Sequence, residues 1–221
     1  MNISDAQKEM RSRFIGGFYG QLVSGVLWLV SASLATWSSP RASITTLVVG
    51  GFFIFPLTEL LVRVGGVKGW LSAENSLREL GMQVAFVLPA SMPLLVPVCL
   101  YRLNWFYPAM MILLGAHYLP FVFLYGMRMF AALAALLVGG GIIIALYWSA
   151  SFSVGAWFTG AVLMVFAFVG RTVMQSEFRR GAAQQVAGGD GGIACFSCCV
   201  LRRRLCGLAR RPSAPAFGGH L

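Results

Sequence analysis

The chain has 221 residues, of which 58% are hydrophobic and only 11% are charged, against about 25% charged in an average soluble domain. One core of that size cannot hide so much apolar surface from water, so an ordinary soluble globular protein is excluded and much of the surface must face lipid. The formal net charge of +10 would suggest nucleic acid in a soluble protein. In a membrane chain its meaning depends on where the basic residues lie relative to the apolar runs.

A short cytoplasmic entry helix is predicted over residues 1–13, where Ser4 and Gln7 have the spacing of a capping box. Six apolar segments then approach the roughly 20 residues that a helix needs to cross the bilayer. They cover residues 14–37, 44–62, 81–101, 106–125, 129–148 and 154–170. Most links between them are short, which forces neighbouring spans into antiparallel hairpins. The predicted fold class is an all-α, polytopic transmembrane helix bundle.

Two connections between the predicted spans differ from the others in length. Residues 63–80 form the one long link, and the pattern around Trp70, Leu71, Leu77 and Leu80 predicts a short amphipathic element on the membrane surface. Residues 126–128 separate the fourth and fifth spans, and a tight hairpin is expected there because one helix of about 43 residues would far exceed the bilayer thickness.

The basic residues predict the orientation. With the N-terminus in the cytoplasm, 15 of the 17 basic residues fall inside, and only Arg41 and Arg102 fall outside. This asymmetry sets the orientation of multi-pass proteins. Both termini are therefore expected in the cytoplasm.

Glu59 and His117 are the two intramembrane ionisable residues that chemistry could use. Glu59 lies one turn before Arg63, and an i, i+4 ion pair near the interface is favoured over a proton or cation site. His117 could carry a proton or bind a metal, but a neutral histidine that joins two helices is favoured. No cysteine, histidine or acidic group completes a metal site, and no set of nucleophile and base is visible. We therefore expect no metal, no cofactor and no enzymatic activity.

The third span carries Pro89, Pro93 and Pro97 at four-residue intervals, which places the three rings on one side of the helix. Each proline removes a backbone hydrogen bond, so the span is expected to be bent and buried within the bundle. A gating or substrate-lining helix and a static kink are equally compatible with this pattern.

Small residues mark expected packing faces, because they let helix backbones approach closely. Gly16, Gly20 and Ser24 recur every four residues in the first span, and residues 139–141 are three consecutive glycines in the fifth. Packing is a sufficient explanation for both groups.

The entry ISDAQKEM, the run GQLVSGVLWLVSA and above all PAMMILLGAHYLPFVFLYGMR at 108–128 resemble a family of uncharacterised bacterial multi-pass membrane proteins of unknown function. The resemblance covers about residues 1–175. It implies an integral protein of the bacterial cytoplasmic (inner) membrane and brings no assigned activity. It draws attention to the segment that carries Gly115, His117, Tyr118, Pro120, Tyr125 and Arg128.

Residues 171–221 differ in composition and are predicted to form a disordered basic tail that lies on anionic lipid head groups. The tail holds four of the five cysteines, Cys195, Cys198, Cys199 and Cys206. Neither a zinc site nor disulfides are expected for them in the cytoplasm. The departure from the family pattern suggests an aberrant C-terminus.

Two functional hypotheses remain. The first is movement of a small solute or ion along a path that includes His117, Glu59, Tyr118 and Arg128, beside the bent third span. The alternative is a non-transporting scaffold or sensor that binds other membrane proteins through its small-residue faces. The expected partners are the lipid bilayer, anionic head groups at the tail and a second copy of the chain in a homo-oligomer, with no nucleic acid.

Overall fold

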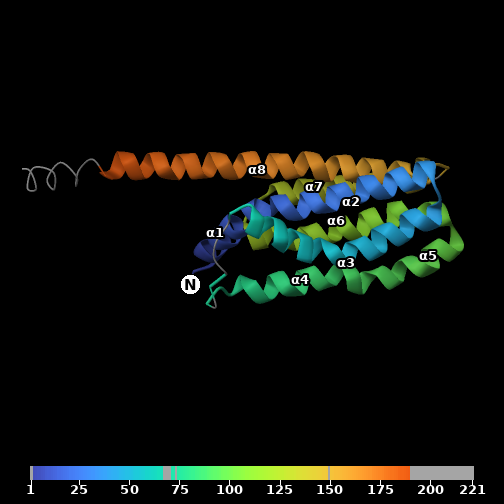
Figure 1. Cartoon of the computed structure of the whole chain (residues 1–221), viewed down its shortest axis with the longest axis horizontal. Helices are drawn as coiled ribbons and strands as arrows, with labels where there is room; N and C mark the ends of the chain where they lie inside the picture. Colours follow the sequence, from blue (N-terminus) through green and yellow to red (C-terminus); the bar gives the residue numbers. More distant parts are fainter. Residues whose placement is uncertain (1, 67–70, 73, 149, 190–221) are drawn as a thin grey trace, which may run out of the picture. The chain divides into compact units, whose positions relative to one another are not determined.

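The computed structural model describes residues 2–66, 71–72, 74–148 and 150–189, and these residues form helices and turns without any strand. The elements are α1 (Ile3–Phe14), η1 (Ile15–Gly17), α2 (Phe18–Trp37), α3 (Pro40–Val64), α4 (Leu77–Ser91), η2 (Met92–Leu94), α5 (Leu95–Tyr101), η3 (Leu103–Trp105), α6 (Phe106–Tyr125), α7 (Met129–Tyr147) and α8 (Val154–Gly189) (Figure 1). Residues Met1–Met174 form one compact unit and Gln175–Leu221 a second. The packing described below lies within the first unit.

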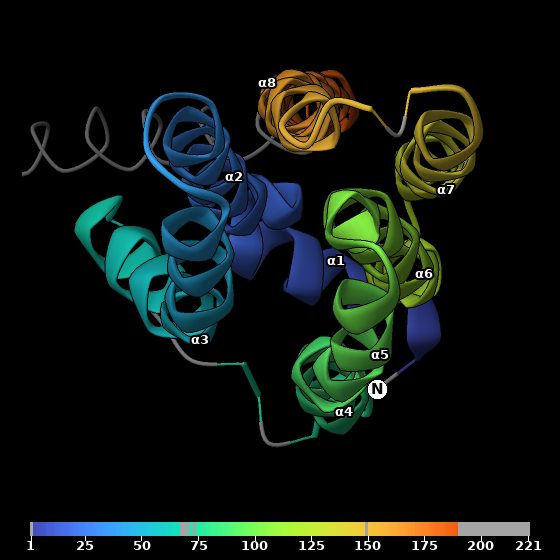
Figure 2. The same ribbon diagram turned by 90° about the vertical axis from the view of Figure 1, so that its right-hand side faces the viewer.

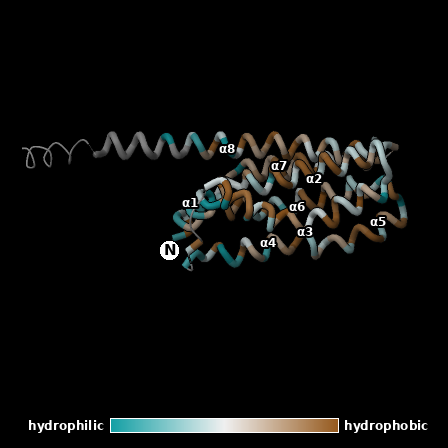
Figure 3. The backbone as a smooth tube through the Cα atoms, viewed as in Figure 1, coloured by the Kyte–Doolittle hydropathy of each residue, from teal (hydrophilic) through white to brown (hydrophobic). Residues whose placement is uncertain are grey.

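In the part of the chain that the structure describes, six helical stretches are long and apolar enough to cross a membrane. They are Ile3–Trp37, Pro40–Val64, Leu77–Tyr101, Leu103–Tyr125, Met129–Tyr147 and Val154–Ser176. Figure 3 shows hydrophilic colour on α1 and at the start of α4, and apolar colour along the spans. The predicted bundle of six spans is confirmed, and the chain is a multi-pass membrane protein.

Several boundaries differ from the sequence prediction. The third span begins at Leu77, so Leu77 and Leu80 belong to the spanning helix and not to a surface element. Trp70 lies outside the described residues. Helix α8 continues to Gly189, although the change in composition at Arg171 predicted that the sixth span would end at residue 170. The four tail cysteines lie outside the described residues.

The first span is two helices joined by a sharp bend. Ile15, Gly16 and Gly17 have φ angles of 49°, 61° and 83°, so three successive residues adopt the left-handed conformation. Glycine does this without a Cβ penalty, whereas for a β-branched residue such as isoleucine it is a strained exception. The bend turns α1 away from the axis of α2 and across the bundle end (Figure 2).

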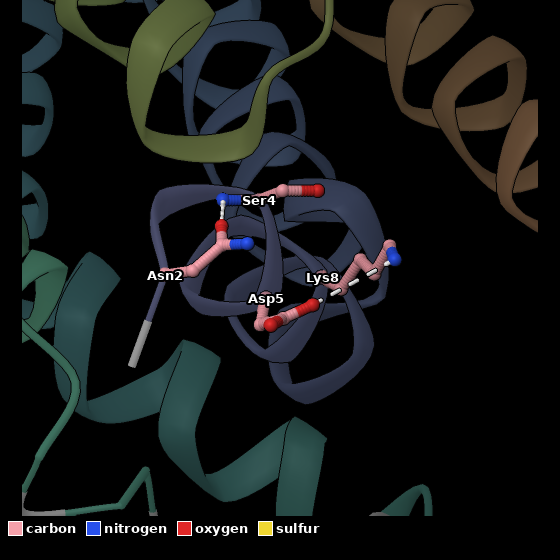
Figure 4. Close-up of polar contacts among 4 residues, drawn as sticks. All are labelled: Asn2, Ser4, Asp5 and Lys8. Carbon is pink, nitrogen blue, oxygen red and sulfur yellow. Dashed lines mark hydrogen bonds and ion pairs between the residues drawn. The ribbon is translucent and has the colours of Figure 1, made fainter.

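The N-terminus of α1 is capped by Asn2, whose side chain accepts a 2.8 Å hydrogen bond from the backbone N–H of Ser4 (Figure 4). The predicted capping box of Ser4 and Gln7 is therefore wrong. Asparagine is an equally good cap, and Gln7 is left free to contact another helix.

Close backbone contacts hold the bundle together. Viewed from its end, α2 and α3 lie side by side, α6 and α7 form a second pair, and the first part of α8 lies between α2 and α7 (Figure 2). A Cβ on Gly141 would lie 2.8 Å from the backbone oxygen of Pro108 on α6, and one on Gly25 would lie 3.3 Å from the backbone nitrogen of Met164 on α8. Small residues thus permit the helix contacts, as expected from the sequence.

The outer faces of α3, α4 and α5 are strongly apolar and exposed. Phe52 and Phe53 on α3, Phe86 on α4 and Leu100 on α5 are each more than half exposed. Large apolar side chains on spanning helices suit hydrocarbon rather than water. Polar side chains with a function are therefore expected on the inward faces of the helices.

Candidate functional site

The inward face of α2 carries three buried polar side chains among its apolar and small ones. Gln21, Ser24 and Ser31 are 2%, 4% and 0% exposed, and their separations of three and seven residues place them on one side of a helix with 3.6 residues per turn. Polar side chains inside a membrane bundle face other helices or a polar pathway rather than lipid. This face is the most unusual feature of the first span.

Two tyrosines of α6 face it. Tyr107 and Tyr118 are eleven residues apart, close to three helical turns, and both are buried. The hydroxyls of Tyr107 and Ser31 lie 2.6 Å apart, and Ser31 Oγ donates to the backbone oxygen of Ser43 on α3 over 3.0 Å. These bonds satisfy the polar groups at one end of the α2 face and tie α2, α3 and α6 together.

Tyr118, a residue singled out from the sequence, lies further along the same face with its hydroxyl beside Ser24. Its ring stacks against Phe130 of α7 with centroids 6.1 Å apart, and Phe121 and Tyr125 complete the aromatic cluster. The cluster contacts the bend between α1 and α2, because a Cβ on Gly17 would be 3.3 Å from the ring of Phe130. Tyr118 is therefore fixed in place by its ring and offers its hydroxyl to α2.

Beyond Ser24 the polar groups lack partners. Both amide atoms of Gln21 are buried without a hydrogen-bond partner, and so is Oγ1 of Thr58 on α3. Thr58 Oγ1 lies 3.8 Å from the position of a Cβ on Gly20, the neighbour of Gln21. A buried polar group left without a partner costs about 1–3 kcal/mol, so the bundle carries uncompensated polarity on α2 and α3.

A buried ion pair follows at the end of this region. Arg13, in the last turn of α1, donates through Nη2 to Oε2 of Glu59 over 2.9 Å, and the two side chains are 8% and 20% exposed. The sequence pointed to Arg63 as the partner of Glu59, whereas this bond reaches across 46 positions to α1. The Nη1 atom of Arg13 is buried without a partner, so the guanidinium is only partly satisfied.

We refer to this set as the polar seam. Its members lie on α1, α2, α3 and α6, and they are Arg13, Gln21, Ser24, Thr58, Glu59 and Tyr118. The Arg13–Glu59 pair leaves the seam without net charge. The seam includes two of the four residues that the sequence proposed for a path, Glu59 and Tyr118.

His117 lies next to the seam. It is half-buried on α6, its ring packs edge-on against those of Tyr118 and Phe121, and its Nδ1 is buried without a hydrogen-bond partner. A histidine that joins two helices would use its ring nitrogens as donor and acceptor, and Nδ1 makes no such bond. Hydrogen-bonding capacity is thus available beside Tyr118.

Arg128 and the prolines lie elsewhere. Arg128 is exposed in the turn between α6 and α7, where its backbone oxygen accepts from Ala131. The third span is interrupted as predicted, into α4, η2 and α5, but Pro93 and Pro97 are exposed and Pro89 is half-buried. The expectation that the bent helix is buried in the bundle was wrong, because its proline face points outward.

Sequence reasoning missed the role of α1 as a brace across the helix ends. Gln7 Nε2 donates to the backbone oxygen of Phe123 over 2.6 Å, and Arg11 Nη1 donates to that of Tyr125 over 2.8 Å. Both acceptors are carbonyls of the last turn of α6, where backbone oxygens lack partners within the helix and where the helix dipole favours a cation such as Arg11.

The same helix holds the segment that leads into α4. The carboxylate of Glu9 accepts from the backbone N–H of Ser72 and from the side chain of Asn75, over 2.8 and 2.6 Å. Asn75 is 3% exposed and also donates to the backbone oxygen of Ala6. The amphipathic pattern of residues 3–14 signals a docked helix, but it does not reveal which helices it contacts.

The described residues contain no group of three or more His, Cys, Asp or Glu side chains that could hold a metal ion. The polar groups of the seam are instead one amide, three hydroxyls and one ion pair. Such groups bind polar molecules through hydrogen bonds rather than metals through a ligand shell.

Residues 3–172 match the family of unknown function DUF7010, and the chain belongs to this family. No curated protein and no solved structure matches the chain. The resemblance inferred from the sequence is confirmed over nearly the extent expected. The family description assigns no activity, so function rests on the geometry of the bundle.

Proposed function

We propose that the protein moves a small polar solute or ion across the bacterial cytoplasmic membrane, with both termini in the cytoplasm. The polar seam is the path, and His117 lies beside it. One observation carries the proposal: the inward face of α2 bears Gln21, Ser24 and Ser31, all buried, and part of this polarity has no partner within the protein.

Buried polar groups without partners carry an energetic cost that packing alone does not require. A bundle that needs only to pack can do so with apolar and small side chains, as α7 does with Leu133, Leu137 and Gly141. Orphaned polar groups in the bundle lower its stability by about 1–3 kcal/mol each. Their presence along one helix face is explained if a polar species occupies that face during function.

The third span has no place in this path. Its prolines face outward, so the alternative of a static kink is the better explanation for them. Arg128 is likewise assigned to the predicted cytoplasmic turn, where a basic residue supports the orientation.

The test is flux in proteoliposomes that contain the purified full chain. Proton entry would be followed with an enclosed pH dye under a potassium diffusion potential, and solute entry by light scattering after osmotic shock. Transport predicts faster flux than in protein-free vesicles and a change in that flux for Ser24→Val, His117→Ala and Glu59→Gln. Thr45→Val is the matched control, because Thr45 is exposed on α3. Flux equal to that of protein-free vesicles for every probe would exclude the proposal.

A second candidate is a scaffold or sensor that binds another membrane protein. It is supported by an almost wholly apolar groove of about 410 Å³ between α7 and α8, in which a Cβ on Gly139 would meet no atom within 4 Å. This function predicts no flux above that of empty vesicles, together with a specific partner that is lost on Gly139→Leu.

A further inference from the structure

Gln21 combines deep burial with a complete lack of hydrogen bonds from its side chain. It is 2% exposed, and neither Oε1 nor Nε2 has a hydrogen-bond partner. A glutamine amide can donate two hydrogen bonds and accept two. Simple packing does not account for a side chain that is fully desolvated and makes none of them.

We propose that the polar seam binds an uncharged solute that presents a hydrogen-bond donor and acceptor side by side, as amides and urea do, and that Gln21 is the residue that recognises it. This inference rests on the proposed transport function and names the class of its substrate. Its first support is the pairing chemistry, because Oε1 and Nε2 lie on one planar group. An amide or urea presents a fixed donor and a fixed acceptor in one plane to both atoms, whereas each hydroxyl of an alcohol donates and accepts and has no fixed planar pair.

The second support is charge. Arg13 and Glu59 neutralise each other across 2.9 Å, and the other four members of the seam are neutral: Gln21, Ser24, Thr58 and Tyr118. A bare ion moved into this region would lose its hydration without meeting an unpaired opposite charge, which is strongly unfavourable. An uncharged solute meets no such barrier.

The third support is the presence of two further unpaired hydrogen-bonding atoms among the seam residues. Thr58 Oγ1 faces Gly20, and Arg13 Nη1 belongs to the guanidinium that Glu59 binds; both atoms are buried without a partner. A hydroxyl can donate or accept, and the guanidinium donates. The seam therefore contains a further donor and a further donor or acceptor for a polar solute, besides the amide of Gln21.

The decisive variant is Gln21→Met, which keeps the length and volume of the side chain and removes both polar atoms. Because the native amide has no partner to lose, an apolar replacement is expected to fold at least as well as the native chain. Gln83→Met is the matched control, since Gln83 is exposed on α4. Unfolding of all three proteins in mixed micelles would confirm that they are folded before flux is compared.

The experiment is stopped-flow light scattering of proteoliposomes with urea, acetamide and glycerol as osmolytes, alongside the proton assay. The inference predicts that urea and acetamide enter faster than in empty vesicles, that glycerol does so much less, and that Gln21→Met lowers urea and acetamide entry about tenfold or more. Gln83→Met is expected to retain the native rates.

The outcomes separate the two proposals. Proton or glycerol flux without urea and acetamide flux would overturn the inference on substrate class and leave transport standing. Urea entry that is equally fast with Gln21→Met would remove the role of Gln21. Failure of every probe to exceed the protein-free rate would overturn both the inference and the proposed function.

Discussion

The ion pair between Arg13 and Glu59 gives the sharpest stability prediction. Glu59→Gln removes one charge and keeps the shape of the side chain, so the guanidinium of Arg13, 8% exposed, is left as a buried charge with a neutral partner. Breaking one side of a buried pair is much more costly than replacing both partners. We expect this substitution to destabilise the bundle and to loosen α1 in particular.

The magnitude follows from the geometry. Two unit charges about 4 Å apart attract by about 4 kcal/mol at an effective dielectric of about 20, and the neutral amide introduced by Glu59→Gln would retain a hydrogen bond that returns about 1 kcal/mol. Since the Glu59 side chain is still 20% exposed, solvent screens part of the remainder. The expected loss in free energy of unfolding is about 2–3 kcal/mol.

Equilibrium unfolding in mixed detergent micelles, followed by tryptophan fluorescence, measures this loss. The control is Asp5→Asn, which removes the exposed pair of Asp5 and Lys8, 3.8 Å apart with side chains 57% and 66% exposed (Figure 4). Exposed pairs contribute less than about 1 kcal/mol. Arg13→Met with Glu59→Gln should cost less than the sum of the two single changes. Equal small losses for Glu59→Gln and Asp5→Asn, or an additive double variant, would refute the reasoning.

Three further predictions concern packing, the docking of α1 and orientation. Gly141→Ala should destabilise the bundle by about 1–3 kcal/mol, because the new Cβ would lie 2.8 Å from the backbone oxygen of Pro108. The Cβ introduced by Gly139→Ala meets no atom within 4 Å, so this change should be neutral or stabilising. Unfolding of the two variants in micelles measures both free energies. Equal losses for Gly141→Ala and Gly139→Ala would contradict the close contact between α6 and α7. Asn75→Ala removes the hydrogen bonds to Ala6 and Glu9, so amide hydrogen exchange should become faster in α1 and stay unchanged in α7; unaltered exchange in α1 would show that the anchor is unimportant. Reporter fusions at Ser39 and Ser151 should lie outside the cytoplasm, and cytoplasmic signals at both would reverse the proposed orientation.

The spans could be predicted because bilayer thickness imposes a length on each apolar run. The ends of the helices were harder to predict from the sequence, because the residue at which a helix starts depends on local hydrogen bonds. At the start of α4, for example, Asn75 accepts from the backbone N–H of Leu77 through its side chain. Composition identifies an apolar run, whereas the end of a helix is fixed by single hydrogen bonds that composition does not record.

Contacts between distant residues account for the largest errors. Local spacing connects Glu59 with Arg63, and nothing in that pattern indicates an arginine 46 positions earlier. The bend that brings Arg13 into place requires Ile15 at φ 49°. A pair of glycines indicates a flexible backbone, but it does not indicate that the isoleucine before it also adopts the left-handed conformation.

The structure also changes which residues deserve functional weight. His117 and the three prolines stand out in the sequence because such residues are uncommon in apolar helices. The energetic cost of a polar side chain, however, depends on its burial and its hydrogen-bond partners and not on how uncommon the residue type is. By this criterion Gln21 is the stronger candidate, since it is almost fully buried with both amide atoms unpaired, whereas Pro93 and Pro97 are exposed and have no polar side-chain atom. The positions of Gln21, Ser24 and Ser31 already define one helix face in the sequence, but only the packing of α6 against that face distinguishes a polar interior from a polar surface.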